Sequence, residues 1–224
     1  MRVVGTGNGI EAVIFDMDGV LIDSEPFWRI AEVEALTAAG VPMTIEDAVE
    51  TTGLRTDEVV EHWFARYPWT TPPKKEVEAR IISRVIDLVR ERGEPTPGML
   101  AALDLLQTRY PLAVASSSAS EIIAAVLEKL GIGGRFVLAQ SAEHEPFGKP
   151  HPGVYIEAAR RLGIPAARCV AIEDSPNGVI AAKAAKMRCI AIPDPELHSD
   201  RRYHAADLIL PSLTELRLET LAGL

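Results

Sequence analysis

The chain contains a short apolar run, Ala12-Val13-Ile14-Phe15, that stops at Asp16-Met17-Asp18-Gly19. An apolar run of this length that ends at charged residues predicts a buried β-strand. Because side chains alternate along a strand, Asp16 and Asp18 should point the same way at its carboxyl end. Two carboxylates this close need a nearby cation or a shared proton. Taken alone, the pair is also compatible with turn aspartates that merely close a strand.

Three further apolar runs end in, or are followed by, residues that can hold phosphate or metal. They are the run 112–115 before Ser116-Ser117-Ser118, the run 136–139 before the loop that carries Lys149, and the run 169–172 before Glu173-Asp174. Helix-length segments separate these runs. This alternation predicts a Rossmann-like α/β fold, in which a parallel sheet has helices on both faces. Such sheets bind ligands beyond the carboxyl ends of their strands, where all four groups of residues are expected to meet.

The segment between the first two runs is far longer than a strand–helix–strand connection requires. Apolar residues at helical spacing fill it, and Pro26 and the stretch 93–98 are typical of linkers at its two ends. We therefore predict a core domain of residues 10–23 and 95–224, with an inserted all-helical cap domain at residues 24–94.

Composition excludes several classes of partner. A net charge of −9 disfavours nucleic acid and anionic membrane surfaces, but leaves room for a small phosphorylated substrate that meets local positive charge. Cys169 and Cys189 lie in apolar runs and are expected to be buried, reduced thiols, and the first nine residues lack the apolar core of a secretory signal. We expect a cytoplasmic monomer that contacts no membrane.

The order of Asp16-x-Asp18, Ser116, Lys149 and Glu173-Asp174 resembles the four motifs of the haloacid dehalogenase superfamily of phosphohydrolases. Within it, a second set of segments is similar to bacterial phosphatases that act on 2-deoxyglucose 6-phosphate and hexitol phosphates. Those segments are Leu21-Ile22-Asp23-Ser24-Glu25-Pro26, Gly53-Leu54-Arg55 and Lys149-Pro150-His151-Pro152. The resemblance implies a magnesium-dependent phosphatase of small sugar or polyol phosphates, hexose 6-phosphates in particular, that forms an aspartyl-phosphate.

The resemblance also implies roles for individual residues. Asp16 would be the nucleophile and Asp18 the general acid and base, while Ser116 and Lys149 would bind the transferring phosphoryl group. The expected Mg²⁺ ligands are Asp16, Asp174, Asp18 through its backbone carbonyl, and Glu173. Glu173 either coordinates through water or orients its loop. The same acidic pair is also compatible with a plain helix N-terminus, capped by Ser175 and followed by Pro176.

Candidate substrate contacts are Ser117, Ser118 and Arg55. Ser118-x-x-Glu121 has the form of a capping box, so a structural role for Ser118 is favoured over substrate contact. A tight turn at Gly53 could aim Arg55 into the cleft, although a surface arginine that starts a helix is a close alternative. Trp28 and Trp63 are expected in the apolar core rather than against a sugar.

Two other functions stay open at this level. A β-phosphoglucomutase-like sugar phosphomutase is one, but such mutases usually carry a histidine ten residues after the second aspartate, where this chain has Trp28. The other is a non-catalytic binding module, which the presence of Asp16, Asp18, Lys149 and Asp174 disfavours.

Overall fold

The computed structural model describes residues 9–194 and 197–224. The first eight residues, on which most of the expectation about a secretory signal rests, lie outside this part. Cys169 and Cys189 are free and buried, as predicted. None of the helices in the described ranges combines the length and the apolar character needed to cross a bilayer.

A six-stranded parallel sheet forms the centre of the molecule, with the strand order β3-β2-β1-β4-β5-β6. The strands are β1 (Ala12–Phe15), β2 (Leu112–Ser116), β3 (Leu138–Ser141), β4 (Cys169–Glu173), β5 (Arg188–Ala191) and β6 (Leu208–Ile209). The last residue of β1, Phe15, pairs with Val114 of β2 and Ile172 of β4. This register places the residues that follow the three strands next to one another, at the carboxyl ends of the strands.

Alternation along β1 divides the core between the two faces of the sheet. Val13 and Phe15 enter one apolar cluster, whereas Ala12 and Ile14 enter the other. The first cluster includes residues of α4 (Met99–Leu106) and α5 (Ser120–Lys129), and the second includes residues of α6 (Gly153–Leu162) and α7 (Pro176–Ala184). The smaller side chains of the second face let α6 and α7 pack closely on the sheet.

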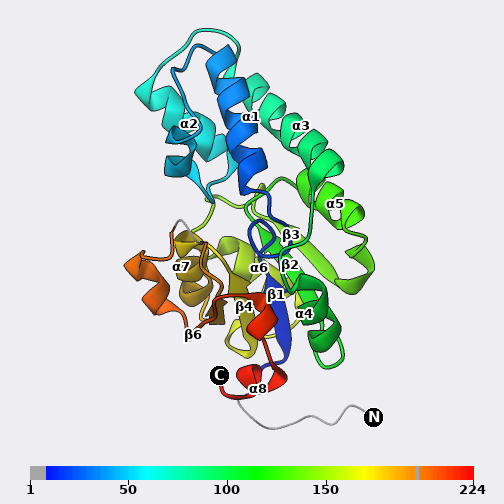
Figure 1. Cartoon of the computed structure of the whole chain (residues 1–224). Coiled ribbons are helices and arrows are strands. Elements are labelled where there is room, and N and C mark those ends of the chain that lie inside the picture. Colours follow the sequence, from blue (N-terminus) through cyan, green and yellow to red (C-terminus); the bar gives the residue numbers. More distant parts are fainter. Residues whose placement is uncertain (1–8, 195–196) are drawn as a thin grey trace.

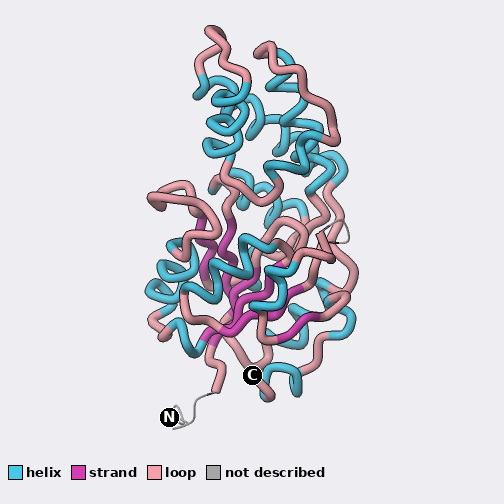
Figure 2. The backbone as a smooth tube through the Cα atoms, turned by 90° about the vertical axis from the view of Figure 1, so that its left-hand side faces the viewer, coloured by secondary structure: helices cyan, strands magenta, loops and turns pink. Residues whose placement is uncertain are grey.

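Residues 25–92, inserted between β1 and β2, form a helical layer above the carboxyl ends of the strands (Figures 1 and 2). Its elements are α1 (Glu25–Ala38), η1 (Asp47–Thr51), α2 (Thr56–Arg66) and α3 (Lys74–Arg92). Helix α3 packs along α5, and the apolar interior of this layer joins the first core cluster. The predicted fold, a parallel sheet with helices on both faces and helices inserted after the first strand, is confirmed.

One strand differs from the prediction. The apolar run 136–139 predicts a strand there, but β3 begins two residues later and ends in polar Gln140 and Ser141. Phe136 instead packs edge-on against Phe15, and Val137 is exposed. Because β3 lies at the edge of the sheet, its pairing with β2 does not require apolar side chains. The remaining short elements are η2 (Gly133–Arg135), η3 (Ala166–Arg168), η4 (Arg201–Ala205), η5 (Leu213–Glu215) and α8 (Leu218–Ala222).

Candidate active site

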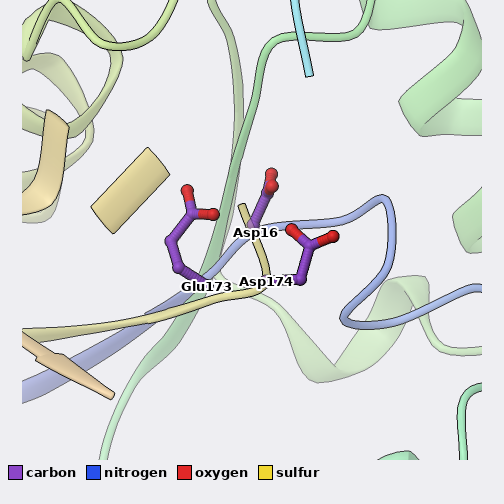
Figure 3. Close-up of side chains that lie close together, drawn as sticks. All are labelled: Asp16, Glu173 and Asp174. Atoms are coloured by element: carbon purple, nitrogen blue, oxygen red, sulfur yellow. The ribbon is translucent and has the colours of Figure 1, made fainter. Parts of the chain in front are cut away.

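Three acidic side chains meet where β1 and β4 end. Asp16 follows β1, while Glu173 and Asp174 end and follow the neighbouring β4, and their carboxyl groups face the same side (Figure 3). One oxygen atom of each lies within 4.8 Å of the others, and all three residues are buried. The parallel register brings these residues together, although more than 150 positions separate them in the chain.

Lys149 supplies a positive charge inside this acidic group. Its Nζ lies 2.9 Å from Oδ1 of Asp16 and 2.6 Å from Oε1 of Glu173, and it donates a hydrogen bond to the carbonyl of Ala115 at 3.2 Å. The residue is 2% exposed. It is therefore a buried ionic partner of the acidic residues.

Burial and mutual repulsion make the carboxylates hard to ionise without a cation. Burial, with a contribution from Glu173, raises the pKa of Asp16 to about 8 even though Lys149 acts to lower it. Burial and the nearby Asp16 and Glu173 hold the pKa of Asp174 well above its usual range. Burial disfavours the charged form of Lys149, but Asp16 and Glu173 outweigh this effect and raise its pKa. One lysine thus offsets only part of the negative charge.

Glu173 lies behind Lys149 and is not among the described residues that line the pocket. Its Oε1 accepts hydrogen bonds from Lys149 and from the hydroxyl group of Tyr155 on α6. Its carboxyl group packs against the backbone of Gly178, where a Cβ atom would lie 2.0 Å from it. Tyr155 was not predicted, since a tyrosine in the first half of an amphipathic helix carries no sign of such a contact. The capping role predicted for Ser175 is confirmed, because its Oγ accepts from the backbone N–H of Gly178.

The carboxylate of Asp18 is held by donors from both sides of the pocket. The hydroxyl group of Ser24 donates to its Oδ1 at 2.5 Å, and the indole N–H of Trp28 donates to the same atom at 3.0 Å. From the end of β2, the hydroxyl groups of Ser118 and Ser116 donate to its Oδ2 at 2.6 and 3.4 Å. Asp18 therefore lies between the helical layer and the sheet.

These contacts change two predictions. The capping box at Ser118 is wrong, because α5 begins at Ser120 and Ala119 occupies its N-cap position. Ser118 points instead to Asp18. Trp63 is buried in the core as expected, but Trp28 packs on the core and also lines the pocket. Helical periodicity cannot separate these two positions of a tryptophan.

A pocket lies between the strand ends and the helical layer. On the sheet side it is lined by the residues that we call the core wall: Asp16, Asp18, Ser116, Ser117, Ser118, Lys149 and Asp174. On the other side it is lined by the residues that we call the cap wall: Glu25, Trp28, Arg29, Glu32, Thr51 and Thr52. In the core wall, the Oγ atom of Ser117 is buried without a hydrogen-bond partner in the described part of the chain.

The polar residues of the cap wall were not predicted from the sequence. Glu32 is 4% exposed, and its Oε2 accepts a hydrogen bond from the hydroxyl group of Thr51 at 2.8 Å. Burial raises the pKa of Glu32 to about 7, and burial followed by the charge of Asp18 raises that of Glu25 to about 8. Arg29 acts in the opposite direction on both.

Arg55 is not among the residues that line the pocket. Gly53 has the positive φ of +79° that a tight turn requires, but Arg55 then occupies the N-cap position of α2. Its guanidinium group donates to the carbonyls of Ala142 and Glu145, at 3.0 and 2.6 Å, and pairs with Asp57. Thus neither sequence alternative describes Arg55: it is neither in the cleft nor on the surface, but links α2 to the loop before Lys149.

The comparisons with known proteins agree with this geometry. The family described as haloacid dehalogenase-like hydrolase matches residues 10–186. Hexitol phosphatase B of Escherichia coli (strain K12) is 44% identical over 222 residues, which cover 98% of this chain and all of the relative. Fructose-1-phosphate phosphatase YqaB of the same organism is 30% identical over 183 residues, covering 80% of this chain and 95% of the relative.

Among solved structures, CbbY from Rhodobacter sphaeroides in complex with phosphate superposes with a TM-score of 0.87. It is 29% identical, and the superposition covers 95% of this chain and 99% of that one. The similarity therefore extends over the sheet and the inserted helices together.

Proposed function

Because the chain belongs to the haloacid dehalogenase-like hydrolases, we propose that it is a phosphatase of small sugar or polyol phosphates. One observation carries this proposal. A buried aspartate paired with a buried lysine, Asp16 with Lys149, lies beside a second aspartate, Asp18, on one wall of a pocket whose opposite wall is polar. The first wall suits a phosphoryl group and the second suits hydroxyl groups.

The proposed reaction has two steps on the core wall. A carboxylate oxygen of Asp16 attacks phosphorus, and the bond from phosphorus to the ester oxygen breaks as Asp18 gives its proton to that oxygen. A water molecule then attacks the aspartyl-phosphate, and Asp18 accepts a proton from it. Phosphate leaves, and Asp16 is restored as a carboxylate. Asp18 can serve both transfers because it lines the pocket. The donors on its two oxygens orient its carboxyl group.

The other residues of the core wall would hold the phosphoryl oxygens. The Oγ atom of Ser117 lacks a partner and can donate to one of them. Ser116 and Lys149 add a hydroxyl group and a positive charge at the ends of neighbouring segments. Glu173 and Tyr155 keep Lys149 in place from behind, so we assign Glu173 mainly to positioning. Ser118 and Arg55, the other candidate substrate contacts from the sequence, are less favoured because their side chains are bonded elsewhere.

We further propose Mg²⁺ as the cofactor. The donor set fits, since Asp16, Asp174 and Glu173 offer hard oxygen atoms and carry more negative charge than Lys149 offsets. Asp18 would contribute its backbone carbonyl. When bound, Mg²⁺ supplies positive charge that screens the nucleophile from the incoming phosphate dianion.

The substrate assignment is supported by the relatives and by the pocket. Both curated relatives are phosphatases, of hexitol phosphates and of fructose 1-phosphate by their names. The mutase alternative has less support, because Trp28 occupies the position expected for a histidine, and its indole N–H can donate a hydrogen bond but cannot act as a base. A non-catalytic binding module also has less support, because it would not need all the residues of the core wall.

We also propose that the chain is divided as predicted into a core domain (residues 10–23 and 95–224) and a cap domain (residues 24–94). We further propose that it is a cytoplasmic monomer without nucleic-acid partners.

A phosphate-release assay tests the proposed function. Purified protein with Mg²⁺ is given hexitol phosphates, hexose 6-phosphates, nucleotides and p-nitrophenyl phosphate. We expect the highest kcat/KM on a hexose or hexitol phosphate. A clear preference for nucleotides would contradict the substrate class, and absence of release from every ester would contradict the enzyme assignment.

A further inference from the structure

Lys149 lies in the loop of residues 142–152, which connects the edge strand β3 with α6. Between Ala142 and Gly148 this loop runs over the surface, and its large apolar side chain, that of Phe147, is 63% exposed. The chain becomes buried again at Gly148 and Lys149. Because the exposed part has no apolar anchor, the hydrogen bonds of its backbone determine where the chain returns to the site.

The start of α2 supplies several of these hydrogen bonds. Oε1 of Glu58 accepts from the backbone N–H of Gly148 at 2.8 Å, and Oε2 of Glu58 accepts from the backbone N–H of Arg55 at 3.3 Å. The guanidinium group of Arg55 donates to two carbonyl groups earlier in the loop, those of Ala142 and Glu145. One carboxylate of the helical layer thus joins its own helix to the residue that precedes Lys149.

Glu58 and Gly148 also pack closely. A Cβ atom at position 148 would lie well under 3.0 Å from Oε2 of Glu58, and its three nearest neighbours would all be atoms of the Glu58 carboxyl group. The φ angle of Gly148 is not positive, so its backbone conformation does not itself require glycine. The carboxyl group of Glu58 is therefore what leaves no room for a side chain at this position.

The position of Gly148 matters for the neighbouring lysine. Because Lys149 follows directly, any shift of Gly148 moves the backbone from which the lysine side chain extends. Its Nζ atom has little freedom to compensate, since it contacts Asp16, Glu173 and the carbonyl of Ala115 within 3.2 Å. A misplacement of about 1 Å in an active site can cost about 10²-fold in rate.

We propose that Glu58 is a positioning residue for Lys149. It is not among the described residues that line the pocket, so it acts on the reaction through Gly148 rather than by touching the substrate. This inference rests on the proposed phosphatase function. It gives the first turn of α2 a role in the chemical step that is the same for every ester, whereas a carboxylate that only capped α2 would affect stability and leave kcat unchanged.

Four variants test the proposal. Glu58→Ala removes the acceptor, and Glu58→Gln keeps a carbonyl oxygen that can accept from the N–H of Gly148. Gly148→Ala places a Cβ atom against Glu58, and the double variant combines Glu58→Ala with Gly148→Ala. The matched control is Glu61→Ala, because Glu61 lies on the same helix but is exposed and pairs with Lys74.

The kcat is measured on sorbitol 6-phosphate and p-nitrophenyl phosphate, well below the melting temperature of each variant. Glu58→Ala should lower kcat about tenfold on both esters, and Glu58→Gln should recover most of this loss. Inhibition by inorganic phosphate should also weaken in Glu58→Ala, because phosphate in the site would contact Lys149 but not Glu58. The control should match the wild type in every measurement.

Gly148→Ala should lose about as much activity as Glu58→Ala, since each change breaks the same contact. For that reason the double variant should be no less active than either single variant. Losses that multiply in the double variant would overturn the inference, because Gly148 would then act independently of Glu58.

The inference would also fail if Glu58→Ala kept the kcat of the wild type, lost activity on only one ester, or kept the wild-type inhibition by phosphate. A wild type inactive on both esters would instead overturn the proposed function itself.

Discussion

The two walls of the pocket are built in different ways. The core wall is carried by residues at the ends of neighbouring parallel strands, and the hydrogen bonds of the sheet fix their spacing. The cap wall is carried by one helix face and a loop, and it reaches the pocket only because the helical layer packs above the strands. The first arrangement is suited to holding reacting atoms, and the second can change its side chains without disturbing the sheet.

This difference predicts a division of function between the two walls. A change in the core wall should affect every phosphate ester alike, because each ester presents the same phosphoryl group there. A change in the cap wall should affect esters according to their leaving groups. The following experiments use sorbitol 6-phosphate and p-nitrophenyl phosphate side by side to test this division.

The largest effect is expected for Asp16→Asn. An amide oxygen is a poor nucleophile, so kcat should fall by at least about 10⁴-fold on both esters. Steady-state phosphate release measures the loss, and Asp23→Asn, an exposed aspartate of the same segment, is the control. Activity well above background on either ester, after contaminating phosphatases are excluded, would rule out Asp16 as the nucleophile.

Removal of divalent metal should have the second-largest effect. Excess chelator should abolish phosphate release from both esters, and Mg²⁺ should restore it, because the acidic residues of the site carry more charge than Lys149 offsets. The check is a titration of activity with Mg²⁺ after chelation. Zn²⁺ should not replace it, since all proposed ligands are hard oxygen atoms. Undiminished turnover in chelator would contradict the proposed cofactor.

Tyr155→Phe should have an intermediate effect on both esters. It removes a hydroxyl donor from the buried carboxylate of Glu173, which should cost about 1–3 kcal/mol of stability. Chemical denaturation measures that cost, and the kcat on the two esters should fall by the same factor as Lys149 loses its fixed position. Tyr110→Phe, at a partly exposed site, is the control. If only sorbitol 6-phosphate were affected, the assignment of Tyr155 to the core side would be wrong.

Arg55→Ala tests the contact between α2 of the helical layer and the loop before Lys149. A position of Arg55 in the cleft, one of the two sequence alternatives, predicts a larger loss on sorbitol 6-phosphate than on p-nitrophenyl phosphate. The observed bonds to Ala142 and Glu145 instead predict similar, several-fold losses on both esters. The kcat/KM of each ester decides between the two. Arg66→Ala on the same helix, whose exposed side chain pairs with Glu50, should leave both values unchanged.

The sequence predicted the core wall better than the cap wall for a physical reason. Asp16, Ser116 and Asp174 each follow a buried apolar run, so a strand and its end could be inferred for each position. Lys149 required the family resemblance, because it follows a long loop after an edge strand whose position was mispredicted by two residues.

Glu25, Arg29 and Glu32 look, in sequence, like the solvent-facing side of an amphipathic helix. Only the docking of α1 over the strand ends buries them, and no local pattern reports that docking. Trp28, Tyr155 and Arg55 share this limit, since each is hydrogen-bonded to a partner outside its own helix.

The central claim is that the core wall contacts only the transferred phosphoryl group, whereas the cap wall contacts only the leaving group. It is tested most directly by the decay of the phosphorylated protein. Protein is mixed with either ester, quenched rapidly, and the phosphate on Asp16 is quantified by mass spectrometry over time. Once the leaving group has departed, the two phosphorylated proteins are identical, so we expect phosphate on Asp16 and the same decay rate from both esters. Different decay rates, or turnover without phosphate on Asp16, would contradict the account.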